Sequence, residues 1–201
     1  MAVGAYGLSF GAAAVTAGLS TAQACVLSLL LFTGASQFAL VGVLGAGGSG
    51  VAAVAGALLL GTRNTLYAVR LSSLVPVRGP RRLVAAQLTI DEPTGMATAA
   101  PPGLAGTAFW ATGASVYVLW NLATLAGAVG AARLGDPGAL GLDAAVPAAF
   151  LALLAPQLRT GGLRVAALAG ALVAAAAIPF TPPGVPVLLA GLVVVPALVR
   201  R

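Results

Sequence analysis

The sequence predicts an all-α integral membrane protein, a polytopic helical bundle of about seven spanning helices with a re-entrant or interfacial hairpin on the cytoplasmic side. Of its 201 residues, 60% are hydrophobic and 7% are charged, a composition typical of membrane proteins. Residues 1–62 contain no Lys, Arg, Asp, Glu or His, and about 20 apolar residues suffice for one helical crossing. Residues 51–60 and 165–178 are apolar on every side. Barrel strands alternate polar and apolar residues, so the sequence favours helices.

Seven apolar stretches are predicted as spans, and Gly-rich or Pro-rich turns such as 45–50 and 179–186 separate them. In chain order the predicted spans cover residues 2–19, 22–46, 51–71, 104–132, 144–158, 163–178 and 187–199. Residues 72–82 are polar, and residues 83–100 are amphipathic, which predicts the hairpin. The whole chain, 1–201, is interpreted as one transmembrane domain with an N-terminal half 1–100 and a C-terminal half 101–201.

The arginines predict the orientation of these spans. With the C-terminus in the cytoplasm, nine of the ten arginines lie inside and Arg133 alone lies outside, as the positive-inside rule requires. The N-terminus is then outside, and residues 83–100 enter and leave on the cytoplasmic side. Because the arginines lie between apolar segments rather than along one face, the net charge of +6 does not indicate nucleic-acid binding.

The chain offers few groups for covalent or metal chemistry. It contains no His and no Lys, and its one cysteine, Cys25, lies inside an apolar segment. An enzyme would need a nucleophile with a base or a metal cluster, and most zinc and haem sites need His or several Cys. We therefore expect no enzymatic activity, no metal and no cofactor.

Polar groups interrupt the middle of the second predicted span, at residues 32–38 (FTGASQF). Gly34 loosens a helix, and Thr33, Ser36 and Gln37 offer hydrogen-bond donors and acceptors at mid-bilayer depth. Discontinuous helices of this kind hold substrates in many carriers. The alternative is helix packing, because small and polar residues also join helices in membranes. The sequence leaves both interpretations open.

Charged residues follow at two places. Arg63 and Asn64 lie at the inner end of the third predicted span, where an arginine either extends to the interface or binds a carboxylate with its planar fork. Asp91 and Glu92 lie together in the amphipathic hairpin, beside apolar neighbours. A partly buried carboxylate has a raised pKa and exchanges protons near neutral pH, so these acids are candidates for proton coupling. A solvated loop is the alternative.

Two further features are a proline near the acids and a Trp-Asn pair inside the fourth predicted span. Pro93 is expected to help end a helix, because the residue before a proline avoids the helical conformation. Trp120 and Asn121 lie inside the fourth predicted span. They either pack between helices or form the wall of a pocket.

Taken together, these motifs resemble the AzlC family, the large subunit of two-component branched-chain amino acid exporters. The similarity runs in order along nearly the whole chain, through residues 7–11 with 18–20, 32–38, 63–67, 89–92, 120–121, 141–143 and 150–151. Family members commonly carry an Asn two residues before the arginine and a His after it, where this chain has Gly61 and Asn64.

The resemblance implies a permease of the bacterial plasma (inner) membrane that exports leucine, isoleucine and valine, with methionine as a further candidate. It implies proton coupling and a small four-helix membrane subunit of the AzlD type. The alternative is a channel-like or scaffold subunit for another small hydrophobic solute. The candidate residues are, for substrate binding, Thr33, Gly34, Ser36, Gln37, Arg63, Asn64, Trp120 and Asn121, and, for proton coupling, Asp91 and Glu92.

Overall fold

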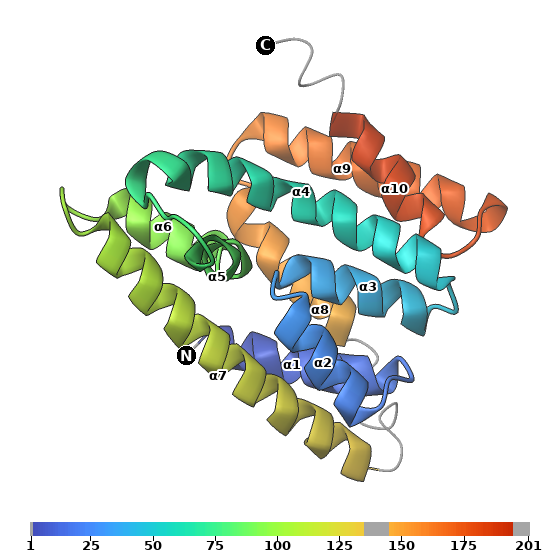
Figure 1. The fold of residues 1–201 in the computed structure, drawn as a ribbon. Coiled ribbons are helices and arrows are strands. Elements are labelled where there is room, and N and C mark those ends of the chain that lie inside the picture. Colours follow the sequence, from blue (N-terminus) through green and yellow to red (C-terminus); the bar gives the residue numbers. More distant parts are fainter. Residues whose placement is uncertain (1, 135–144, 195–201) are drawn as a thin grey trace.

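The computed structural model describes residues 2–134 and 145–194, and all regular elements in these ranges are helices (Figure 1). The α-helices are α1 Ala2–Thr16, α2 Thr21–Leu30, α3 Ala35–Gly45, α4 Gly50–Leu74, α5 Arg81–Gln87, α6 Asp91–Ala99, α7 Ala105–Arg133, α8 Ala145–Leu154, α9 Gly161–Ala177 and α10 Val185–Gly191. Single 3-10 turns extend the last three, namely η3 Ala155–Gln157, η4 Ile178–Phe180 and η5 Leu192–Val194. The predicted helical class is confirmed for this part of the chain.

The number of spans stays a prediction. Within residues 2–134 and 145–194, two runs are long and apolar enough to cross a membrane, α7 and the run Gly161–Phe180 that joins α9 to η4. Helix α4 has 25 residues, about 37 Å at 1.5 Å per residue, but it contains Arg63. Residues 141–143, which contribute to the family resemblance, and residues 195–199 of the last predicted span lie outside the described residues.

The helices are arranged around α7 and α4. Helix α7 runs along one side of the molecule, and α1 and α2 pack on it (Figure 1). Helices α3 and α4 pack together as a hairpin, and α8 contacts both α1 and α3. Helix α6 packs between α4 and α7, whereas α9 and α10 form a second hairpin on α4. The broken and charged segments therefore meet between α4, α6 and α7.

Glycines bring α1 and α7 into close contact. A side-chain carbon at Gly11 would overlap the carbonyl oxygen of Thr124, and one at Gly127 would overlap the carbonyl of Leu8. Gly7 lies four residues before Gly11, and its added carbon would lie 2.8 Å from Ala123 Cβ. Residues at this spacing share a helix face, and small residues there let membrane helices approach closely. The motif at residues 7–11 therefore positions α1 against α7.

We expect Gly11→Val to destabilise the protein, because the added side chain forces α1 away from α7. Overpacking of a close contact costs about 1–3 kcal/mol, which thermal unfolding of the purified protein in detergent measures as a lower midpoint. Gly130→Val is the control, since an added carbon at Gly130 on α7 meets nothing within 4 Å. Equal midpoints for the two variants would show that the α1–α7 contact does not limit stability.

Two breaks interrupt the helical order. Leu31–Gly34 separate α2 from α3, and Gly34 adopts φ +63°, ψ −92°, a conformation that residues with a Cβ atom rarely adopt. This confirms the expectation that Gly34 interrupts the second predicted span. Leu88–Ile90 separate α5 from α6 within the predicted hairpin, and the side chains of Leu88 and Ile90 are buried. The neighbours of the two acids are therefore buried, whereas Asp91 and Glu92 themselves are exposed.

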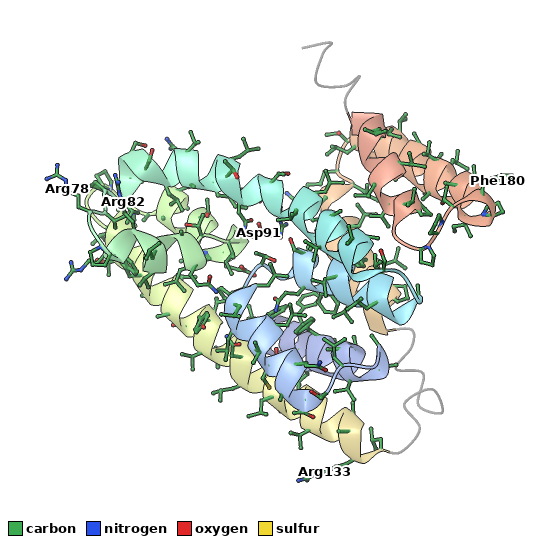
Figure 2. All side chains as sticks on the ribbon, turned by 45° about the vertical axis from the view of Figure 1, so that its right-hand side comes forward. Arg78, Arg82, Asp91, Arg133 and Phe180 are labelled. Carbon is green, nitrogen blue, oxygen red and sulfur yellow. The ribbon has the colours of Figure 1, made fainter. Side chains whose placement is uncertain are left out.

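The expectation for Pro93 was wrong. Pro93 is the third residue of α6 and lies in its first turn, so it begins a helix rather than ending one. Proline is tolerated there because the first N–H groups of a helix have no partner within the helix. Figure 2 labels Asp91, the first residue of α6, between the ends of the molecule, whereas Arg78 and Arg82 lie at one end and Arg133 at the far end of α7.

Candidate functional site

A cavity of about 470 Å³, which we call the polar cavity, lies where the break before α3 meets α4, α6, α7 and α8. Its lining combines charged, aromatic and aliphatic side chains. The lining residues are Val3, Tyr6, Phe32, Thr33, Gly34, Ala35, Phe38, Leu60, Arg63, Tyr67, Ile90, Asp91, Glu92, Val116, Trp120, Phe150, Leu154 and Gln157. Six of the ten residues named from the sequence line it, namely Thr33, Gly34, Arg63, Asp91, Glu92 and Trp120.

Arg63 joins three separate segments at this cavity. Its Nη1 donates a hydrogen bond to Asp91 Oδ2 over 2.9 Å, which is also an ion pair, and its Nη2 donates to the backbone oxygen of Thr33 over 3.1 Å. The planar fork of arginine suits two acceptors in fixed positions. Arg63 therefore fastens α4 to both helix breaks, which extension to the membrane interface alone would not explain.

The motif at 32–38 divides into lining and supporting residues. Thr33 and Gly34 line the polar cavity, whereas Ser36 and Gln37 are fully buried and do not. Gln37 Oε1 accepts a hydrogen bond from the backbone N–H of Gly34 over 3.1 Å, and so stabilises the break. A side-chain carbon at Gly61 of α4 would lie 3.6 Å from Ser36 Oγ, so Ser36 faces α4.

The two acids of α6 differ in their surroundings. Asp91 is paired with Arg63, whereas Glu92 lines the cavity without an ion pair among residues 2–134 and 145–194. Loss of hydration raises the pKa of Glu92, and Asp91 raises it further while Arg63 lowers it. With nine residues, α6 is about 14 Å long, too short to cross a bilayer. The surroundings of Glu92 thus favour its protonated form more than free solution does.

Trp120 forms an aromatic wall. It stacks on Phe10 with ring centroids 6.3 Å apart and meets Phe38 edge-on at 6.5 Å. Asn121 Nδ2 donates to the Tyr117 backbone oxygen over 2.8 Å, and neither Asn121 nor Asn64 lines the polar cavity. Trp120 therefore belongs to the pocket wall, and Asn121 is tied to its own helix.

Several polar atoms at and behind this cavity are buried without hydrogen-bond partners in the described part of the chain. They are Thr33 Oγ1, Ser36 Oγ, Gln37 Nε2, Arg63 Nε, Asn64 Oδ1, Thr94 Oγ1, Trp120 Nε1 and Asn121 Oδ1. Buried polar atoms in proteins nearly always have a partner. Their concentration here indicates a region that receives water or a polar solute.

Six lining residues with polar or aromatic side chains were not among the candidate site residues, and four of them, Phe32, Phe38, Tyr67 and Phe150, lie in motifs that carry the family resemblance. Tyr67 lies one turn after Arg63 on the same helix face, a spacing that identifies it once Arg63 is placed. Tyr6 and Gln157 come from α1 and η3. No local pattern marks these two, because they reach the cavity only through packing of distant helices.

A second polar opening adjoins the first. This vestibule, about 470 Å³ in volume, is lined by Arg63, Tyr67, Asp91, Thr94, Gly95, Thr98, Ala99 and Gln157. Arg63, Tyr67, Asp91 and Gln157 also line the polar cavity. The Arg63–Asp91 ion pair therefore lies between the two spaces.

One comparison with known proteins identifies a family. A family model described as AzlC protein matches residues 1–134. No curated protein and no solved structure matches this chain. The matched residues include α1–α7, which supply most of the polar cavity, whereas Phe150, Leu154 and Gln157 come from the part beyond the match.

Proposed function

The chain belongs to the AzlC family, a family of membrane transporters for amino acids rather than of enzymes, and from this premise we propose that it is the large subunit of a secondary, proton-coupled exporter of branched-chain amino acids. The observation that carries the proposal is the polar cavity, where a broken helix, an ion pair and the carboxyl of Glu92, which has no ion pair within the described residues, meet within apolar walls. Leucine, isoleucine and valine are the proposed substrates, and methionine is a further candidate.

The carboxylate of the substrate is proposed to bind between Arg63 and the first turn of α3. Arg63 Nε is buried and lacks a partner among the described residues, and Gly34 and Ala35 open the N-terminus of α3 onto the cavity. Helix N-termini favour negative charge. Half-helices that end near a substrate carboxylate are common in transporters.

The ammonium group and the side chain of the substrate require different surroundings. Glu92 and Asp91 are the acids that line the described cavity, and a carboxylate is the natural partner of an ammonium group. Phe38, Trp120 and Phe150 supply apolar walls for an aliphatic side chain. A zwitterion with a hydrocarbon side chain thus matches the distribution of charge in the cavity.

Proton coupling is proposed to use Asp91 and Glu92. A raised pKa lets Glu92 bind a proton at a higher pH than an exposed glutamate does. Protonation of Glu92 removes one of the two negative charges beside Arg63, so protonation and substrate binding are electrostatically linked. Asp91 lines both the polar cavity and the vestibule, whereas Glu92 lines the polar cavity.

Family membership supports the proposed partner and location. We propose a small four-helix AzlD-type subunit as the partner, the bacterial plasma membrane as the location and export as the direction. Many large apolar side chains on the described helices are exposed, which suits contact with lipid and with a membrane subunit.

We expect Gln37→Ala to weaken substrate binding, because the break before α3 loses the hydrogen bond between Gln37 and Gly34. One hydrogen bond contributes about 1 kcal/mol, or roughly fivefold in KM for leucine. Gln23→Ala is the matched control, since Gln23 Oε1 accepts from the Ser20 backbone N–H at the exposed start of α2, over 2.8 Å. If Gln37→Ala instead separates the subunits at unchanged KM, Gln37 serves helix packing.

Counterflow tests the proposal. Vesicles that contain this chain and its small partner are loaded with unlabelled leucine, and entry of labelled leucine is followed without a pH gradient. We expect the internal leucine to accelerate entry, because a carrier exchanges substrate across the membrane. Entry that internal leucine does not accelerate would indicate a channel, and no entry would indicate a scaffold subunit or another solute.

A further inference from the structure

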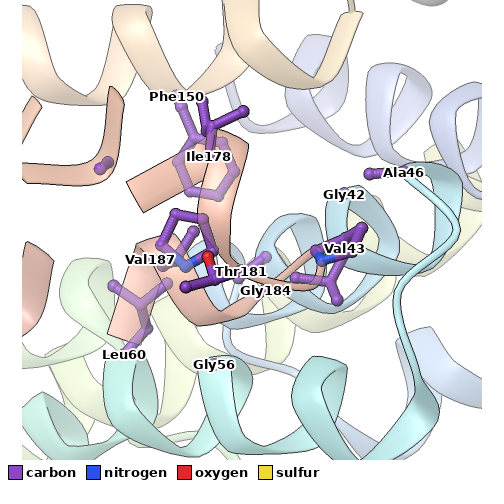
Figure 3. A pocket seen from close by; sticks show the side chains of 14 residues that line it. Gly42, Val43, Ala46, Gly56, Leu60, Phe150, Ile178, Thr181, Gly184 and Val187 are labelled. Atoms are coloured by element: carbon purple, nitrogen blue, oxygen red, sulfur yellow. The ribbon is translucent and has the colours of Figure 1, made fainter. Parts of the chain in front are cut away.

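A larger cavity of about 690 Å³, which we call the apolar cavity, lies beside the polar one. Figure 3 shows residues that line it, with Gly56 and Leu60 on α4, Phe150 on α8, and Ile178 and Val187 on the C-terminal hairpin. Thr181 is its one lining residue with a polar side chain, and its hydroxyl donates to the Ala177 backbone oxygen over 2.8 Å. A charged group that entered this cavity would therefore lose its hydration and gain few hydrogen-bond partners.

The two cavities meet end to end. Along α3, the lining of the polar cavity ends at Phe38 and that of the apolar cavity begins at Ala39. Along α4, Leu60 lines both cavities, and Gly56, one turn earlier, lines the apolar one. Phe150 of α8 also lines both. Leu60 and Phe150 thus form the partition between a charged space and an apolar space.

We propose that the apolar cavity receives the aliphatic side chain of the substrate while the charged groups of the substrate stay in the polar cavity, and that the side chain passes the partition formed by Leu60 and Phe150. The proposal rests on the proposed function. It adds a location for the selection of aliphatic over polar side chains, because a polar side chain entering this cavity loses hydration without gaining partners.

The position of the apolar cavity supports a side-chain pocket that extends the polar cavity rather than an isolated site. Along α4, Tyr67 and Arg63 line both the vestibule and the polar cavity. Leu60, one turn earlier, lines both the polar and the apolar cavity, and Gly56, another turn earlier, lines the apolar cavity. The vestibule, the polar cavity and the apolar cavity therefore follow one another along one helix. A lipid acyl chain is also apolar and is the alternative occupant of this cavity. The experiment below distinguishes it from the side chain of the substrate.

The test labels one position of the apolar cavity. In the full chain assembled with its partner, Cys25 is replaced by Ser and Gly56 is replaced by Cys. The new side chain fits, because an added side-chain carbon at Gly56 meets nothing within 4 Å. A hydrophilic, membrane-impermeant thiosulfonate is then applied with and without leucine. We expect labelling of Gly56→Cys, slowed severalfold by leucine, and no effect of leucine on the control Gly130→Cys of α7.

Other outcomes overturn the proposal. If a lipophilic maleimide labels Gly56→Cys and the hydrophilic thiosulfonate does not, the cavity is assigned to a lipid acyl chain. If leucine does not slow the labelling, the apolar cavity is not part of the substrate site. Leucine counterflow by the Cys25→Ser chain is measured in the same vesicles. If counterflow persists while the labelling result fails, the proposed function stands and this inference falls.

A second variant tests selection by size. Gly56→Leu narrows the apolar cavity, so we expect leucine transport to fall by roughly tenfold relative to valine, which is one methylene smaller. Gly130→Leu adds the same side chain in open space on α7 and should leave the ratio unchanged. An equal loss of leucine and valine transport in Gly56→Leu would contradict a role of this cavity in side-chain selection.

Discussion

Arg63→Lys is expected to remove most leucine transport, although the positive charge is kept. A lysine ammonium cannot reproduce the two hydrogen bonds of the Arg63 guanidinium, to Asp91 and to the Thr33 backbone oxygen. Loss of charge-assisted hydrogen bonds costs about 1.5–3 kcal/mol each, or roughly 10- to 100-fold in affinity. The measurement is initial leucine counterflow as a function of leucine concentration.

Arg70→Lys is the matched control, because Arg70 lies on the same helix, is exposed, and does not line the polar cavity. It should transport at the rate of the unchanged chain. Full activity of Arg63→Lys would mean that Arg63 contributes charge alone or serves only as an interfacial anchor. Both variants are compared at equal amounts of folded protein, measured by gel filtration in detergent.

Asp91→Asn is expected to abolish leucine movement driven by a pH gradient while the subunits still assemble. The substitution keeps the size of the side chain but removes the negative charge beside Arg63 and its ability to bind a proton. Neighbouring Glu92 then loses the negative charge that, together with loss of hydration, raises its pKa. Gradient-driven uptake and copurification of the partner are measured on the same preparation.

Asp136→Asn serves as the control, since Asp136 belongs to the predicted loop between the segments 104–132 and 144–158. It should leave gradient-driven transport unchanged. Unchanged transport in Asp91→Asn would remove Asp91 from the coupling role and leave Glu92 as the remaining candidate.

The sequence was sufficient for the helical class and for the main break. Gly34, a flexible residue among polar ones in an apolar run, predicted where α2 ends and α3 begins, and the structure has the break there. Arg63 and Asp91 were named separately as candidate site residues, but the ion pair between them was not predicted. They lie 28 residues apart, and only the packing of α6 against α4 brings them together.

The rest depends on helix rotation and distant packing. After the break at Gly34, the direction of each side chain follows from the new helix axis, so Ser36 and Gln37 proved to lie behind the cavity rather than in it. Phe150 and Gln157 come from the second half of the chain, and only the packing of distant helices brings them to the polar cavity. Gly11 marked the family resemblance, whereas its physical role is close contact with α7.

The most direct test of the central claim is transport in vesicles that contain this chain, with and without its small partner, under an imposed pH gradient. Labelled leucine, valine and methionine are supplied in turn. The account predicts gradient-dependent flux of leucine that requires both subunits and disappears when the gradient is collapsed. Absence of flux for all three amino acids, with both subunits assembled, would contradict branched-chain amino acid export by this chain.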